Sequence, residues 1–188
     1  MIRLFTGIDL PDSVRNSLVR LERGLPFVRW RPRENLHITL AFIGEVDGNM
    51  AREIDAELSR IRAPAFDLRL KGTGQFGKER PHTLWAGIED PGGLTHLAAK
   101  VATALGQIGV KLEKRKFIPH VTLAYVKDLR PAPINAFVAR HSDYATEPFH
   151  VGGFSLYQSH LGKGASHYVV RADYDLVDLP VVSERASS

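Results

Sequence analysis

The chain contains no cysteine among its 188 residues. A disulfide framework, a thiolate nucleophile and a cysteine-ligated metal site are therefore excluded. Long apolar runs are also missing, since no stretch approaches the roughly 18 residues needed to cross a bilayer. The N-terminal segment lacks the long apolar region and the small-residue cleavage site of an export signal. We therefore expect a cytoplasmic protein without a membrane partner.

Charge is only slightly unbalanced, with 25 Lys and Arg against 21 Asp and Glu and a formal net charge of +4. This excess is too small for a nucleic-acid-binding tail, and its placement is more informative. Basic residues precede both of the segments discussed next: Arg29, Arg31 and Arg33 in one case, and Lys114, Arg115 and Lys116 in the other. Such charge at the mouth of a site attracts phosphate-bearing ligands, and the alternative is ordinary solvated charge.

Two segments, 83 residues apart (120 minus 37), are near copies of each other. One reads His-Ile-Thr-Leu-Ala-Phe-Ile over 37–43, and the other reads His-Val-Thr-Leu-Ala-Tyr-Val over 120–126. In a strand, side chains alternate between faces, so His37 and Thr39 share one face while Ile38 faces the other way. Duplication explains the apolar positions, which face a core, but not the polar pairs. The repetition therefore predicts a functional site with a twofold arrangement.

Strands and helices alternate in both halves of the chain. The pattern predicts strands near 2–9, 36–43, 66–70, 83–88, 118–126, 149–158 and 166–177, a short strand at Trp30, and helices near 12–23, 51–61, 94–108 and 133–141. We expect an α+β fold of two similar lobes related by a pseudo-twofold axis, with antiparallel sheets facing a central cleft and helices outside. Residues 1–182 should form a single domain and residues 183–188 a flexible tail.

Glycines mark several of the expected boundaries. Gly44 should end the first motif strand, and Gly109 should end the clearest helix. Gly72, Gly74 and Gly77 predict a glycine-rich loop around Phe76. An aromatic side chain in such a loop either stacks on a nucleobase or packs against the core.

Two histidines that flank one reacting centre suit displacement at phosphorus. The unperturbed pKa of histidine is about 6.5, so one ring can accept the proton of water while the other protonates the departing oxygen. Each proton transfer contributes about 10²–10⁴ in rate. Thr39 and Thr122 lie about 6.6 Å from their histidines along the same face and can donate to phosphate oxygens. No metal or other cofactor is required.

A structural role is the alternative for a single His-x-Thr pair. On one strand such a pair is usually half-buried at the surface, and only its duplication makes it informative. A zinc site would need further ligands, and no carboxylate lies at ligand spacing from His37 or His120. The remaining histidines show no such repetition and are expected in turns or on the surface: His82, His96, His141, His150, His160 and His167.

The chain resembles the 2H phosphoesterase superfamily, and within it the bacterial and archaeal RNA 2′,3′-cyclic phosphodiesterases, or 2′-5′ RNA ligase (LigT-like) group. The doubled motif is specific for the superfamily, and flanking segments indicate the subgroup: 3–8, 34–44, 74–77, 84–88, 117–124 and 156–159. The resemblance implies an RNA or oligonucleotide substrate that ends in a 2′,3′-cyclic phosphate, and a product with a 2′-phosphate. It implies that His37 is the proton donor, that His120 is the proton acceptor, and that Thr39 and Thr122 hold the phosphate. It also implies the reverse 2′-5′ ligation.

One position departs from the family pattern. Tyr125 stands where a basic residue often follows the second Thr-Leu-Ala, so another cation such as Arg31 is expected to contact the substrate. Further substrate-binding candidates are Phe76, Arg115, Lys116 and Tyr125, and Lys163 and Tyr168 could line the cleft.

Two rival functions stay open at this point. One is a cyclic phosphodiesterase that acts on a small nucleotide, such as a cyclic phosphate of ADP-ribose. The other is a non-catalytic nucleotide-binding module. We expect a monomer, although the pattern of residues itself does not determine the oligomeric state.

Overall fold

The computed structural model describes residues 1–22, 24–113, 116–128, 130–160, 162 and 166–178. The expectations for Lys114, Arg115, Lys163 and the tail 183–188 lie outside this part of the chain. Within the described ranges, no helix has the length and apolar character that a membrane crossing requires.

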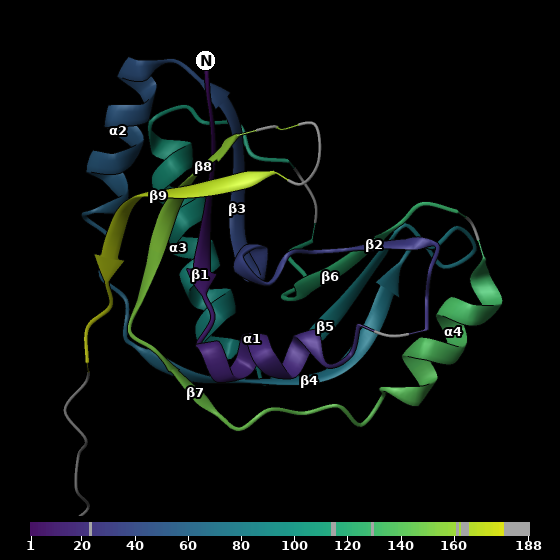
Figure 1. Ribbon diagram of the computed structural model, residues 1–188. Coiled ribbons are helices and arrows are strands. Elements are labelled where there is room, and N and C mark those ends of the chain that lie inside the picture. Colours follow the sequence, from purple (N-terminus) through teal and green to yellow (C-terminus); the bar gives the residue numbers. More distant parts are fainter. Residues whose placement is uncertain (23, 114–115, 129, 161, 163–165, 179–188) are drawn as a thin grey trace, which may run out of the picture.

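Strands dominate the fold, and helices separate them along the chain (Figure 1). The strands are β1 (Ile2–Asp9), β2 (Val28–Trp30), β3 (His37–Val46), β4 (Phe66–Phe76), β5 (Thr83–Glu89), β6 (Val121–Val126), β7 (Phe149–Val151), β8 (Gly153–His160) and β9 (His167–Asp175). The α-helices are α1 (Asp12–Val19), α2 (Gly48–Leu58), α3 (Gly92–Gln107) and α4 (Pro131–Arg140), and a 3₁₀ turn, η1, covers Arg33–Asn35.

The strands form one curled sheet in the order β7-β4-β5-β6-β3-β1-β8-β9, with β2 beside β6 (Figure 1). The pairs between these strands are antiparallel. The two motif strands, β3 and β6, meet in the middle through one residue pair, Ile38 with Val121. The expected α+β fold with a duplicated, antiparallel arrangement is therefore confirmed, and the two half-sheets are continuous through this junction.

Alternation along the motif strands separates the core from the polar pairs. Ile38 and Val121 are fully buried in the hydrophobic core, whereas His37 and Thr39 are only partly buried. The core is completed by the apolar stripes of α2 and α3, and α3 packs on β3 and β4 and lies behind β1 and β3 in the view of Figure 1. The helices thus leave the opposite face of the central strands to the polar pairs.

Two expected strand ends are wrong for the same physical reason. Gly44 has a φ of +89° but does not end β3, because the β1–β3 register shifts beside it and pairing then continues to Val46. Gly72, with a φ of +69°, lies at a similar register shift, so β4 continues past the predicted end at residue 70 as far as Phe76. A glycine in the left-handed region is as compatible with a bulge as with a turn. Phe76 therefore ends a strand and is not part of a glycine-rich loop.

The segment predicted as one strand over 149–158 is also different in the structure. It is two strands, since β7 pairs with β4 and β8 pairs with β1, so the chain changes from one half of the sheet to the other near Gly152. At α1, Pro11 occupies the N-cap position and no side chain caps the helix. Asp12 instead accepts a hydrogen bond from Arg33 at 2.7 Å.

Candidate active site

The β3–β6 junction brings the two histidines together. His37 opens β3, and His120 immediately precedes β6, so each lies one residue before a member of the Ile38–Val121 pair. The charge of His120 lowers the pKa of His37, which places the two rings within electrostatic reach of each other. The two halves of the sheet therefore present their polar pairs at a common position.

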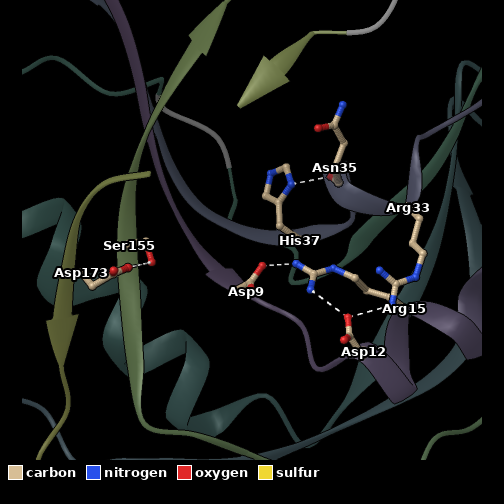
Figure 2. Close-up of polar contacts among 8 residues, drawn as sticks. All are labelled: Asp9, Asp12, Arg15, Arg33, Asn35, His37, Ser155 and Asp173. Atoms are coloured by element: carbon tan, nitrogen blue, oxygen red, sulfur yellow. Dashed lines mark hydrogen bonds and ion pairs between the residues drawn. The ribbon is translucent and has the colours of Figure 1, made fainter. Parts of the chain in front are cut away.

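Both rings are held by the same backbone contact. Nδ1 of His37 is 2.8 Å from the carbonyl oxygen of Asn35, and Nδ1 of His120 is 2.7 Å from that of Ile118 (Figure 2 shows the first). A carbonyl oxygen only accepts, so Nδ1 carries the proton in each ring. In the neutral form, Nε2 is then the basic nitrogen of both histidines. This equivalence extends the twofold relationship from sequence to proton positions.

Asn35 is fixed from a distant part of the chain. Its side chain is 5% exposed, and its Nδ2 donates to the carbonyl oxygen of Ser166 at 2.7 Å. The 3₁₀ turn η1 that contains Asn35 is therefore connected to the start of β9, and the His37 anchor is rigidly placed.

Thr39 lies next to the basic nitrogen of its histidine. Its Oγ1 is 3.0 Å from Nε2 of His37, and with Nδ1 protonated the hydroxyl is the donor. Thr122 occupies the equivalent position in β6, where it pairs with Trp85 of β5. Each threonine thus lies in a motif strand, two residues after its histidine.

Although part of the residue remains accessible to solvent, desolvation dominates the protonation of His37. Desolvation lowers its pKa to about 4, the Asn35 carbonyl opposes this shift, and the positive charges of Arg31, His120 and Arg15 lower the pKa further. At neutral pH the ring is therefore uncharged in the ligand-free protein.

Aromatic rings surround each histidine. The centroids of Phe5 and Tyr168 lie 4.9 and 5.3 Å from that of His37, and Tyr168 meets the ring edge-on at 90°. Phe76 meets His120 edge-on at 4.8 Å, and Trp85 lies 6.3 Å away. Phe76 was a candidate from sequence, and the structure brings it to His120. Phe5 and Trp85 were missed, because no local pattern indicates which apolar strand residues face a site.

Strand β1 approaches His37 closely at Gly7. A Cβ atom at this position would lie 2.8 Å from the carbonyl oxygen of Ile38 and 3.4 Å from Cδ2 of His37. Gly7 pairs with Thr39, so it lies directly beside the first motif. The missing side chain thus leaves the room that the imidazole occupies.

Arg31 connects the two halves beside the histidines. It is 6% exposed, its Nη2 donates to the hydroxyl of Tyr168 at 2.6 Å, and its guanidinium lies 5.5 Å from the ring centroid of Tyr125. Tyr125 belongs to β6 and Tyr168 to β9, which are in different halves of the sheet. The structure thus brings three of the sequence candidates together, whereas Lys116 is exposed between α3 and β6.

Acidic partners compensate other cations near the site (Figure 2). Arg15 forms ion pairs with Asp9 and with Asp12, the latter at 3.8 Å, and Arg33 binds Asp12. The Arg33 guanidinium lowers the pKa of Asp12 through this hydrogen bond and its charge. Of the basic residues that precede the first motif, Arg33 is thus engaged by a carboxylate, while the charge of Arg31 acts on His37.

A metal would need a cluster of suitable side chains. Across the described residues, no three His, Cys, Asp or Glu side chains gather as a metal site would require. The zinc alternative therefore has no ligand set in that part of the chain. The arrangement instead offers two imidazoles, two hydroxyls and a buried guanidinium, a set suited to an anionic group and to proton transfer.

Known proteins share both the sequence pattern and this fold. The family model described as the 2′-5′ RNA ligase superfamily matches residues 10–163. The chain is 32% identical to an RNA 2′,3′-cyclic phosphodiesterase of Archaeoglobus fulgidus, over 84% of this chain and 91% of that protein. It is 33% identical to the Escherichia coli protein of the same name, over 88% and 92%. The crystal structure of Escherichia coli LigT complexed with 3′-AMP superposes with a TM-score of 0.75 at 29% identity, over 94% and 99%.

Proposed function

Because the chain belongs to the 2′-5′ RNA ligase superfamily of 2H phosphoesterases, we propose that it hydrolyses 2′,3′-cyclic phosphates at RNA ends to 2′-phosphates. The observation that supports this proposal is the antiparallel pairing of Ile38 with Val121, whose register sets His37 opposite Thr122 and His120 opposite Thr39, with equivalent backbone anchors for the two histidines. Homologues named RNA 2′,3′-cyclic phosphodiesterase support the substrate class.

The reaction requires two proton transfers. His120 accepts a proton from water through Nε2 as the water oxygen attacks phosphorus. The bond between phosphorus and the 3′-oxygen breaks, and His37 donates its proton to that oxygen. The product has a 2′-phosphate and a free 3′-hydroxyl, and the two histidines have exchanged protonation states.

Substrate binding favours uptake from solvent of the proton that His37 lacks at neutral pH. In the neutral ring, the Thr39 hydroxyl donates to Nε2. Once His37 is protonated, Nε2–H donates to the threonine oxygen. The threonine hydroxyl can then donate its hydrogen bond to a phosphate oxygen instead of to the ring. A bound phosphate anion therefore favours the protonated ring twice, through its charge and through this hydroxyl. We expect the pKa of His37 to rise when substrate binds.

The phosphate is held by groups from both halves. Thr39 and Thr122 donate to its two non-bridging oxygens, and Arg31 contributes the positive charge that the family usually places at the position of Tyr125. The guanidinium is largely buried, so its interaction with an anion is stronger than at the surface.

The same pair of histidines serves 2′-5′ ligation. The 5′-hydroxyl of a second RNA takes the place of water, loses its proton to His120 and closes a 2′-5′ linkage at the phosphorus. In cleavage of that linkage the roles of acid and base are exchanged. Water is in large excess over any RNA hydroxyl, so hydrolysis is the expected net direction in dilute solution.

The test is incubation with a short oligoribonucleotide that ends in a 2′,3′-cyclic phosphate. The expected product is the 2′-phosphate isomer, identified by chromatography against both synthetic isomers, and it should form equally in EDTA. A 3′-phosphate product, or no turnover at all, would contradict the proposal. Turnover that needs a divalent ion would contradict the histidine mechanism while leaving the substrate class intact.

A further inference from the structure

A row of alternating cations and aromatic rings leads away from His37. The guanidinium groups of Arg29 and Arg31 lie 5.7 and 5.5 Å from the ring centroid of Tyr125. Arg29 belongs to β2 and Arg31 directly follows its end, and Trp30 between them packs at 5.8 Å from Phe137 of α4. Arg29, Tyr125 and Arg31 together are termed the track.

The track has an inner and an outer end. Arg31 is buried at the inner end, where its guanidinium lies 5.4 Å from the ring centroid of Tyr168, beside His37. Tyr125 is 37% exposed, and Arg29 is exposed at the outer end. The row therefore runs from the candidate active site to solvent.

These residue types form a surface for single-stranded nucleic acid. A nucleobase stacks on an exposed aromatic ring, and guanidinium groups contact phosphates or the base itself. Two residues of a strand advance about 6.6 Å, which is close to the spacing of successive phosphates in an extended single strand. Arg31 and Arg29 are thus spaced for consecutive phosphates of one chain.

The geometry of the substrate defines which nucleotide the track would meet. A 2′,3′-cyclic phosphate occupies both the 2′- and the 3′-oxygen of the terminal ribose, so the rest of the RNA leaves through the 5′-oxygen. We propose that Tyr125 and Arg29 bind the nucleotide that precedes the cyclic phosphate, and that the protein therefore prefers oligonucleotides to mononucleotides. This inference rests on the proposed function of the histidine site.

Binding measurements test the track without requiring turnover. The probes are a nucleoside 2′-phosphate and a trinucleotide with a terminal 2′-phosphate, and the readout is the ratio of their dissociation constants. The wild-type protein should bind the trinucleotide about tenfold more tightly, or better. Tyr125→Ala should abolish most of this preference, whereas Tyr125→Phe should retain it because the ring is kept. Arg29→Ala should reduce the slope of log affinity against log salt by about 0.7 for the trinucleotide.

A matched pair in the first half of the chain supplies the control. Phe42 occupies the position of Tyr125 in the duplicated motif, is 40% exposed, and lies 5.0 Å from the guanidinium of Arg3. Phe42→Ala and Arg3→Ala remove an equivalent cation–aromatic pair outside the track. Both should leave the binding preference and the salt slope as in the wild type.

Either of two results would contradict the proposal that the track binds the preceding nucleotide. One is an unchanged preference and slope in both Tyr125→Ala and Arg29→Ala, and the other is an equal loss in the Phe42→Ala control. Failure of the wild-type protein to cleave a cyclic phosphate would count against the proposed function, and the binding ratio would still decide the track.

Discussion

At the scale of single residues, the two histidines have equivalent anchors, and the environment of His37 lowers its pKa strongly. Burial and the nearby positive charges of Arg31 and Arg15 keep its ring neutral without ligand. Such a site favours binding of an anion. The negative charge of the anion reduces the electrostatic cost of protonating His37.

Removing either imidazole tests the acid–base assignment. His37→Ala and His120→Ala should each lower turnover of a cyclic phosphate by about two decades or more, because each removes one proton transfer. Steady-state kinetics with an oligonucleotide substrate measures this loss. His96→Ala, at an exposed position of α3, is the matched control and should retain wild-type turnover. Circular dichroism checks that the fold is intact, and near-wild-type activity in the double histidine variant would refute the mechanism.

The threonines should contribute less than the histidines. In the proposed complex, Thr39→Val and Thr122→Val each remove one hydrogen bond to a charged phosphate, worth about 1.5–3 kcal/mol, which corresponds to roughly a ten- to hundredfold loss in kcat/KM. Thr39→Ser, which keeps the hydroxyl, should restore most of the activity. Equal activity of the valine and serine variants would show that the hydroxyl does not touch the reacting group.

The low pKa of His37 also predicts a contribution to stability that depends on pH. Between pH 6.5 and 4 the unfolded state binds more protons at this residue than the folded state, so its contribution is complete above pH 6.5 and is lost as pH falls. Between pH 7 and 5 the loss amounts to about 2 kcal/mol. The free energy of unfolding, measured with urea at both pH values, should fall from pH 7 to pH 5 by about 2 kcal/mol less in His37→Gln than in wild type. Parallel decreases would mean that the ring titrates normally.

At the scale of elements, adjacent strands determine how a motif is presented. The duplicated sequence places His37 and Thr39 on one face, but β1 decides how closely the imidazole is enclosed. Gly7 lies opposite Thr39, and Phe5 of the same strand covers the His37 ring. Because Phe5 also stacks on Tyr157 of β8 at 4.9 Å, three strands contribute to one wall of the site.

Adding a methyl group at Gly7 should disturb that wall. Gly7→Ala places a carbon 2.8 Å from the Ile38 carbonyl oxygen, so β1 and β3 must move apart. We expect a loss of about 1–3 kcal/mol in the free energy of unfolding and a fall in kcat of about tenfold. Thermal unfolding and steady-state kinetics measure the two effects.

Gly106 is the control for this change. It lies in α3, where an added Cβ atom would meet no heavy atom within 4 Å outside its own helix backbone and chain neighbours. Gly106→Ala should therefore be neutral or stabilise the helix by up to about 1 kcal/mol. A Gly7→Ala protein as stable and as active as Gly106→Ala would show that the close approach has no consequence.

At the scale of the whole molecule, the halves of the sheet meet at a narrow junction. β3 and β6 share one residue pair, and β7 and β8 carry the chain from one half to the other. Arg31 adds a contact between the halves through Tyr168. A ligand held by groups from both halves would therefore add a further connection across the junction.

Phosphate should consequently stabilise the folded protein. At about a hundredfold excess over its Kd, inorganic phosphate should add about 2.7 kcal/mol, or roughly 5–10 °C in Tm. Differential scanning fluorimetry in phosphate and in sodium chloride of equal ionic strength measures the effect. The double variant Thr39→Val/Thr122→Val should lose most of the phosphate shift. An identical shift in chloride, or in the double variant, would place the anion elsewhere.

The positions of the two polar pairs follow from the sequence alone, because the period of a strand assigns side chains to faces. The duplication then distinguishes the two His-x-Thr pairs, as the candidate site, from the other polar residues. The alternation of strands and helices likewise predicts the α+β class. Local patterns did not reveal that Gly44 and Gly72 lie within strands, since a left-handed glycine suits a bulge and a turn equally.

Only the tertiary structure decided what surrounds the histidines. Arg31 reaches Tyr168 over 137 positions of the chain, and Phe5 and Trp85 become walls of the site through pairing between distant strands. The lowered pKa of His37 arises from the same long-range packing. Burial, ring contacts and electrostatic coupling depend on distances in space, and a sequence specifies these only through the register of strands that are far apart along it.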